Sequence, residues 1–146
     1  MNKKTELFLI IGFGQIGASI KDRLLNYKKL NDNFDICIYD THKFDNYYNN
    51  HLIDEKFTIV NKLESSIDFT KYQNINIIVC IDTNKHQTFF ESKNKSISST
   101  LLGLFFTEKY LQNEDTQVNI IIESTVPAGT AEQFQHKIIK QNCLKN

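Results

Sequence analysis

Five short apolar segments are spaced along the chain between longer polar stretches, and each has the length of a β-strand. The first is a continuous apolar run over residues 7–11, and the second, residues 34–39, alternates between apolar and polar positions before Asp40. The other predicted strands are residues 57–60, 76–81 and 118–122. The run at 76–81 is apolar in its middle and bounded by polar residues, which is typical of a strand covered on both faces of a sheet.

Segments with helical periodicity separate these strands. The first predicted helix follows the first strand, stops near Leu30 and carries apolar residues at helical spacing. These are Ile16, Ile20, Leu24 and Tyr27. Further helices are predicted around residues 97–111 and 130–138, whereas the polar stretch 41–56 predicts a short helix and a loop. Alternating strands and helices require right-handed crossovers and a parallel sheet, most simply in the order 3-2-1-4-5 with helices on both faces.

Composition limits the class of protein. The chain has 146 residues, enough for one domain with its own core, so we expect a single domain over residues 1–146. Seventeen basic residues balance seventeen acidic ones, so no overall field favours nucleic acid or an anionic membrane. No apolar run approaches the length of a membrane span, and the N-terminus leads into a strand rather than a secretory signal. These features predict a cytoplasmic protein with neither a nucleic-acid nor a membrane partner.

Three cysteines, Cys37, Cys80 and Cys143, form no C-x-x-C pair and have no neighbouring histidine. This pattern favours free thiols in a reducing compartment over disulfides or a metal site. We therefore expect no metal ligands among them.

Three glycines with G-x-G-x-x-G spacing, Gly12, Gly14 and Gly17, follow the first strand and open the first helix. In this context the first glycine permits a sharp turn, the second lets backbone approach a pyrophosphate, and the third allows close packing of helix on sheet. The helix N-terminus, with Gln15 and Ile16 in its first turn, then faces the phosphates. The pattern predicts a Rossmann-type α/β fold with a dinucleotide site. The alternative is a tight strand-to-helix turn without a ligand.

Asp40 ends the second predicted strand, roughly where a Rossmann fold places the acid that binds the adenosine ribose. A carboxylate there would repel a 2′-phosphate, so NAD is the predicted cofactor. His42 and Lys43 follow at once and would suit NADP instead. The other alternative is a solvated aspartate at a strand end.

Residues 121–130, Ile-Ile-Glu-Ser-Thr-Val-Pro-Ala-Gly-Thr, closely resemble the strand-and-loop motif of the UDP-glucose and UDP-N-acetylmannosamine dehydrogenases, a family of nucleotide-sugar 6-dehydrogenases. Cys80 and Thr83 match the family's turn after the fourth strand, although Asp82 and Asn84 replace its prolines. The resemblance implies that the three glycines bind the pyrophosphate, that Asp40 binds the ribose, and that Thr83 lies beside the cofactor. It also implies that Thr125 lies near the nicotinamide. A loop hydroxyl that satisfies local backbone is the alternative role for Thr125.

Enzymes of that family oxidise a sugar alcohol to a carboxylate through a cysteine in a second half of the chain. We expect the present chain to lack that half, and Cys143 has no activating neighbour in the sequence. The resemblance therefore implies a cofactor half that is inactive alone and that works with a second polypeptide or a missing C-terminal half. Two alternatives stay open: a non-catalytic NAD-binding or interaction module, and the cofactor domain of an enzyme similar to the prephenate dehydrogenases, which the start of the chain also resembles.

Overall fold

The computed structural model describes residues 5–40, 57–60, 67–80, 116–123, 128–129, 132 and 135–136. The chain divides into two compact units, of which the first comprises Met1–Ile81 and Asp115–Glu123 and the second Asp82–Glu114 and Ser124–Asn146. The first unit holds the β-sheet and its helix. In the second, Glu132, Gln135 and His136 are helical, in agreement with the last predicted helix. The single domain over residues 1–146 stays a prediction.

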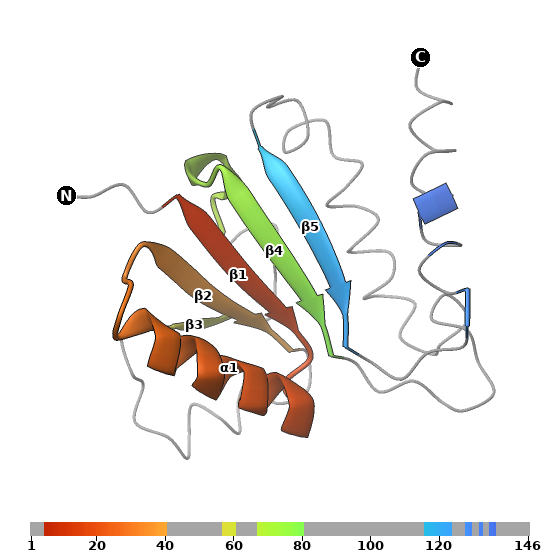
Figure 1. Ribbon diagram of the computed structural model, residues 1–146, viewed down its shortest axis with the longest axis horizontal. Coiled ribbons are helices and arrows are strands. Elements are labelled where there is room, and N and C mark those ends of the chain that lie inside the picture. The colour runs from red at the N-terminus through yellow and green to blue at the C-terminus, as the bar shows by residue number, and fades with distance from the viewer. Residues whose placement is uncertain are drawn as a thin grey trace. The chain divides into compact units, whose positions relative to one another are not determined.

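The sheet of the first unit has five parallel strands in the order β3-β2-β1-β4-β5, which confirms the predicted topology (Figure 1). The strands are β1 (Glu6–Ile11), β2 (Phe34–Tyr39), β3 (Thr58–Val60), β4 (Asn74–Val79) and β5 (Gln117–Ile122). Helix α1 (Gln15–Lys28) connects β1 to β2, and a 3-10 turn, η1 (Phe69–Lys71), precedes β4. The fold is thus a Rossmann-type α/β fold.

Both faces of the central strands are buried. On one face, side chains of β1, β2, β3 and β4 form a core with Phe13 and Phe57, against which Ala18, Ile20 and Leu24 of α1 pack. On the other face of β1, Leu7, Leu9 and Ile11 are fully buried. Burial on both faces explains why β1 is a continuous apolar run rather than an alternating one.

The predicted first helix is confirmed as α1, and its four apolar residues differ in how far they are buried. Ile20 and Leu24 pack on the core, but 47% of Ile16 and 52% of Tyr27 are exposed. Gly17 and Lys28 are the buried residues of the helix. Both ends of the helix still contact the sheet, since Gly17 packs on Gly12 and Tyr27 stacks on the ring of Phe34, with ring centroids 5.7 Å apart.

One polar row crosses the sheet on the face that carries α1. The side-chain amide of Asn76 in β4 donates to the Glu6 carboxylate of β1 at 2.8 Å, and the side-chain amide of Asn119 in β5 donates to the side-chain oxygen Oδ1 of Asn76 at 3.0 Å. Gln117 donates to Asn119 in turn, at 3.2 Å. Asn76 is buried, so these bonds satisfy polar atoms that would otherwise be costly to bury.

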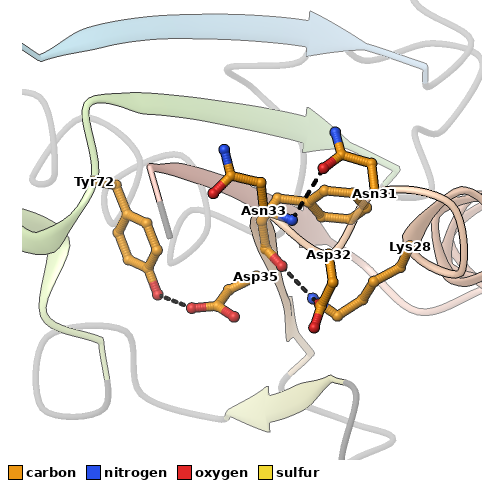
Figure 2. A network of polar contacts seen from close by, with 7 residues as sticks. Lys28, Asn31, Asp32, Asn33, Asp35 and Tyr72 are labelled. Atoms are coloured by element: carbon orange, nitrogen blue, oxygen red, sulfur yellow. Dashed lines mark hydrogen bonds and ion pairs between the residues drawn. The ribbon is translucent and has the colours of Figure 1, made fainter. Parts of the chain in front are cut away.

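Helix α1 is joined to the amino end of β2 by a buried lysine (Figure 2). The Lys28 ammonium donates to the carbonyl oxygen of Phe34, lies 4.9 Å from the centre of the Phe34 ring and pairs with Asp32 at 2.6 Å. At the same end of the sheet the Tyr72 hydroxyl donates to the Asp35 carboxylate at 2.8 Å. Burial, followed by this bond, raises the pKa of the Tyr72 hydroxyl.

Candidate functional site

The carboxyl ends of the parallel strands meet at one edge of the sheet (Figure 1). Ile11 at the end of β1 is level with Tyr39 of β2 and with Val79 of β4, and Val79 is level with Ile122 of β5. The residues that follow these strands therefore lie along one edge; they are Gly12, Asp40, Cys80 and Glu123. In open α/β sheets this edge is where ligands bind.

Gly12 turns the chain out of β1. Its φ of 94° lies in the left-handed region, which a side chain would strain, and its N–H donates to the carbonyl oxygen of Tyr39 at 2.9 Å. Gly17 serves packing instead. A Cβ at position 17 would overlap the carbonyl oxygen of Gly12 and lie 3.2 Å from the carbon of that carbonyl. Both glycines are thus required by the fold itself.

Gly14 has no such structural requirement. Its φ is −81°, which any residue adopts, and a Cβ built on it would meet no atom within 4 Å. The space beside Gly14 is open. This is the space that a pyrophosphate needs when the backbone of the second glycine approaches it.

Gly14 is also the N-cap of α1, and no side chain caps this helix end. The first turn contains no acidic residue, and its Gln15 and Ile16 are exposed. The N–H groups of a first turn have no partners within the helix, and the helix dipole favours an anion there. An anionic group beside Gly14 would satisfy both requirements.

Asp40 follows β2 and is half-buried. Its carboxylate Oδ2 accepts a hydrogen bond from the backbone N–H of Phe13 at 2.7 Å, and its own N–H donates to the carbonyl oxygen of Val60 at 3.3 Å. The structure therefore brings together five of the predicted cofactor residues with Asp40: Gly12, Gly14, Gln15, Ile16 and Gly17. The hydrogen bond from Phe13 directly links Asp40, the residue predicted to bind the ribose, to the glycine-rich turn predicted to bind the pyrophosphate.

Sequence reasoning missed Phe13 as a site residue. Its ring belongs to the buried core, and the Lys21 ammonium of α1 lies 5.7 Å from the centre of that ring and 5.4 Å from the centre of the Phe57 ring. An aromatic residue between the first two glycines was the available signal, because a loop aromatic is costly to leave in water.

Two predicted cofactor residues, Thr83 and Thr125, lie outside the described residues, as do His42, Lys43 and Cys143. The segments leading to these two threonines are adjacent at the sheet edge, since the N–H of Glu123 donates to the carbonyl oxygen of Val79 at 2.9 Å. Their predicted roles stay predictions.

Cys37 and Cys80 are buried and free of disulfides. Burial raises the pKa of the Cys37 thiol to about 12 and that of the Cys80 thiol to about 11, with a smaller contribution from Glu123 in the second case. Thiols of this kind are protonated at neutral pH and are poor nucleophiles. Within the part of the chain that the structure describes, no three His, Cys, Asp or Glu side chains gather in a way that could hold a metal ion.

Comparison of the chain with protein-family models, with curated proteins and with solved structures finds no match. Among the described residues, no helix is both long and apolar enough to cross a membrane. The class of protein is therefore defined by the fold: a Rossmann-type α/β protein with a glycine-rich turn at the carboxyl edge of its sheet.

Proposed function

We propose that this protein binds a dinucleotide at the glycine-rich turn. The observation that carries the proposal is the contrast between the three glycines: the fold requires Gly12 and Gly17, whereas Gly14 borders open space at an uncapped helix N-terminus. A bound pyrophosphate would explain the glycine at position 14, because it would fill that space and accept hydrogen bonds from the first turn of α1.

Within this proposal NAD is the cofactor rather than NADP. Asp40 lies beside the glycine turn, where its carboxylate would bind ribose hydroxyls and repel a 2′-phosphate. A carboxylate offers about four lone-pair positions, so donation from Phe13 is compatible with a ribose hydroxyl at the same group.

Calorimetric titration with NAD and NADP tests the site directly. We expect Gly14→Val to abolish NAD binding while the far-ultraviolet circular dichroism stays unchanged, because the new side chain fills the ligand's space and contacts nothing in the protein. Ser19→Val is the matched control, since it adds the same side chain at an exposed position of the same helix. Unchanged NAD affinity in folded Gly14→Val protein would mean that the glycines serve only the turn.

Asp40→Asn tests the cofactor preference. The variant keeps an acceptor oxygen for Phe13 but removes the charge, so we expect NAD binding to weaken by about 1–2 kcal/mol through loss of charge-assisted bonds to the ribose. The ratio of the affinity for NAD to the affinity for NADP should decrease at the same time. Equal affinity of the unmodified protein for both cofactors would remove Asp40 from the ribose site.

We further propose that the chain is the cofactor half of a nucleotide-sugar 6-dehydrogenase. Two stretches carry the resemblance to that family, one after β4 and one after β5, and the Glu123–Val79 hydrogen bond that joins these strand ends supports the proposal. The oxidation needs a thiolate held near the sugar carbon. Cys37 and Cys80 do not suit this role, because both thiols are buried and their raised pKa values keep them protonated. The same observation is compatible with a second candidate function, a module that binds NAD without catalysis.

An absorbance assay for NADH with UDP-glucose or UDP-N-acetylmannosamine separates these candidates. We expect no NADH from the 146-residue chain alone, and formation of NADH on addition of a second polypeptide that carries a sugar site and a reactive cysteine would support the dehydrogenase proposal. NADH formation by the chain alone that disappears in Cys143→Ser would contradict the expectation and place that thiol in an active site.

A further inference from the structure

Phe13 is held at two points, although it belongs to a turn. Its ring packs in the core beside the Lys21 ammonium, and its backbone N–H donates to the Asp40 carboxylate at 2.7 Å. A ring anchored in the core fixes the side-chain end of a residue, and a hydrogen bond fixes the orientation of its peptide plane. Together they determine the path of the chain from Gly12 to Gly14.

Asp40 can act as a fixed support because its own backbone is fixed. It follows β2, and its N–H donates to the carbonyl oxygen of Val60 at the end of β3. The bond from Phe13 therefore ties the glycine turn after β1 to the ends of two other strands. Hydrogen bonds to an ionised acceptor are about twice as strong as neutral ones, so this bond restrains the turn strongly.

We propose that Asp40 is a positioning residue for the glycine-rich turn, in addition to any contact that it makes with a ribose. By accepting the Phe13 N–H, it holds the turn in the conformation that leaves the space beside Gly14 open. The turn is then preformed before a ligand arrives, and a ligand need not order it on binding. The positioning role stands on the geometry of the free protein; only its consequence for cofactor affinity rests on the proposed function.

Removing the acceptor and removing the charge have different consequences for the turn. Asp40→Asn retains a side-chain oxygen for the Phe13 N–H, whereas Asp40→Ala retains none. The control is Asp35→Ala, which removes a half-buried, hydrogen-bonded carboxylate from the same strand but at its opposite end. All three substitutions remove one negative charge from β2 or its end, but only Asp40→Ala removes the acceptor of the Phe13 N–H.

Hydrogen exchange of the Phe13 amide, followed by nuclear magnetic resonance in the protein without any ligand, tests the proposal. In Asp40→Ala we expect this amide to exchange at least about tenfold faster than in the unmodified protein, the factor that corresponds to a hydrogen bond to a charged acceptor. Asp40→Asn should fall between the two. Exchange of the Phe13 amide in Asp35→Ala and of the Ile10 amide in every variant should stay unchanged.

Equal exchange in Asp40→Ala and the unmodified protein would overturn the proposal, as would an equal acceleration in Asp35→Ala, which would indicate general loosening of β2. Should Asp40→Ala fail to fold, the unmodified protein still decides: a Phe13 amide that exchanges as fast as an unstructured peptide has no such restraint. A separate titration of the same variants with NAD tests the cofactor. Slow Phe13 exchange without NAD binding would keep the positioning role and reject the proposed function.

Discussion

At the scale of single residues, the three glycines of the G-x-G-x-x-G motif differ in what the structure requires of them. Gly12 needs a positive φ, Gly17 needs close contact between helix and strand, and Gly14 needs neither. A motif match in a sequence cannot separate these requirements, because the one-letter pattern is the same in each case. The structure separates them by what a Cβ would meet, and this separation identifies Gly14 as the glycine that neither the turn nor the helix packing requires.

Gly17→Ala should destabilise the protein by about 3 kcal/mol or more, because the added Cβ overlaps a backbone carbonyl that cannot move without shifting β1. Urea unfolding followed by circular dichroism measures the change. Ser19→Ala, at an exposed position of the same helix, should stay within about 0.5 kcal/mol of the unmodified protein. A Gly17→Ala protein of unchanged stability would show that α1 can move away from β1 at little cost.

The sequence predicted the three glycines, Gln15, Ile16 and Asp40 as one group, but it did not predict the bond between Asp40 and Phe13. The motif could be predicted because its spacing along the chain is local. The bond joins residues that are far apart in sequence, and it depends on β1 and β2 ending at the same level of the sheet. Which residues of two strands lie opposite each other is set by the pairing register, and the sequence of one strand alone does not specify that register.

At the scale of elements, the predicted bounds of four strands lie within one residue of the observed ones, and those of the fourth do not. The predicted bounds of the second strand, 34–39, match β2. The fourth strand was predicted two residues late, at 76–81 instead of Asn74–Val79. Asn74 looks like a loop residue in isolation, so the predicted strand began only at Asn76. Within the sheet both are strand residues, because Asn74 pairs with Glu6 and the amide of Asn76 finds partners on both neighbouring strands.

The junction between α1 and β2 contains a buried ammonium, so Lys28→Met should destabilise the protein by about 1–3 kcal/mol. Methionine keeps the aliphatic stem of the side chain but leaves the Phe34 carbonyl oxygen without its donor and removes the charge from the Phe34 ring. The ion pair with Asp32 contributes little, since 69% of that carboxylate side chain is exposed.

Thermal or urea unfolding of Lys28→Met beside Asp32→Asn distinguishes these contributions. Asp32→Asn should change the free energy of unfolding by less than about 0.5 kcal/mol, the usual effect of a surface substitution. A larger loss in Asp32→Asn than in Lys28→Met would mean that the ion pair, and not the bond to Phe34, joins the two elements.

At the scale of the whole molecule, cysteine thiols and a tyrosine hydroxyl with raised pKa values should make the stability of the fold sensitive to alkaline pH. The pKa of Cys37 is raised from 9.0 to about 12 and that of Cys80 from 9.0 to about 11. Between pH 9 and the raised pKa of each thiol, the unfolded chain has therefore lost a proton that the folded chain retains. Stability then falls as pH rises, because the folded state binds more protons than the unfolded state. Tyr72, whose pKa is also raised, acts in the same direction above pH 10.

Between pH 7.5 and pH 9.5 each thiol should lower the free energy of unfolding by about 1 kcal/mol. Urea unfolding at the two pH values measures the loss. In a Cys37→Ala, Cys80→Ala double variant most of this loss should be absent, whatever the variant's stability at pH 7.5. A double variant with the same pH dependence as the unmodified protein would assign the effect to other groups.

The row of amides across β1, β4 and β5 has a consequence for how the sheet assembles. β4 and β5 each contain consecutive isoleucines, and a slip of two residues between them would keep every apolar side chain on its original face. A slip that brought Ile121 of β5 opposite Asn76 would separate Asn119 from Asn76 and leave the buried Asn76 amide oxygen without this donor, at a cost of about 1–3 kcal/mol. The bond between Asn76 and Asn119 thus favours the observed register over this slipped one, a distinction that the nearly interchangeable isoleucines of the two strands do not make.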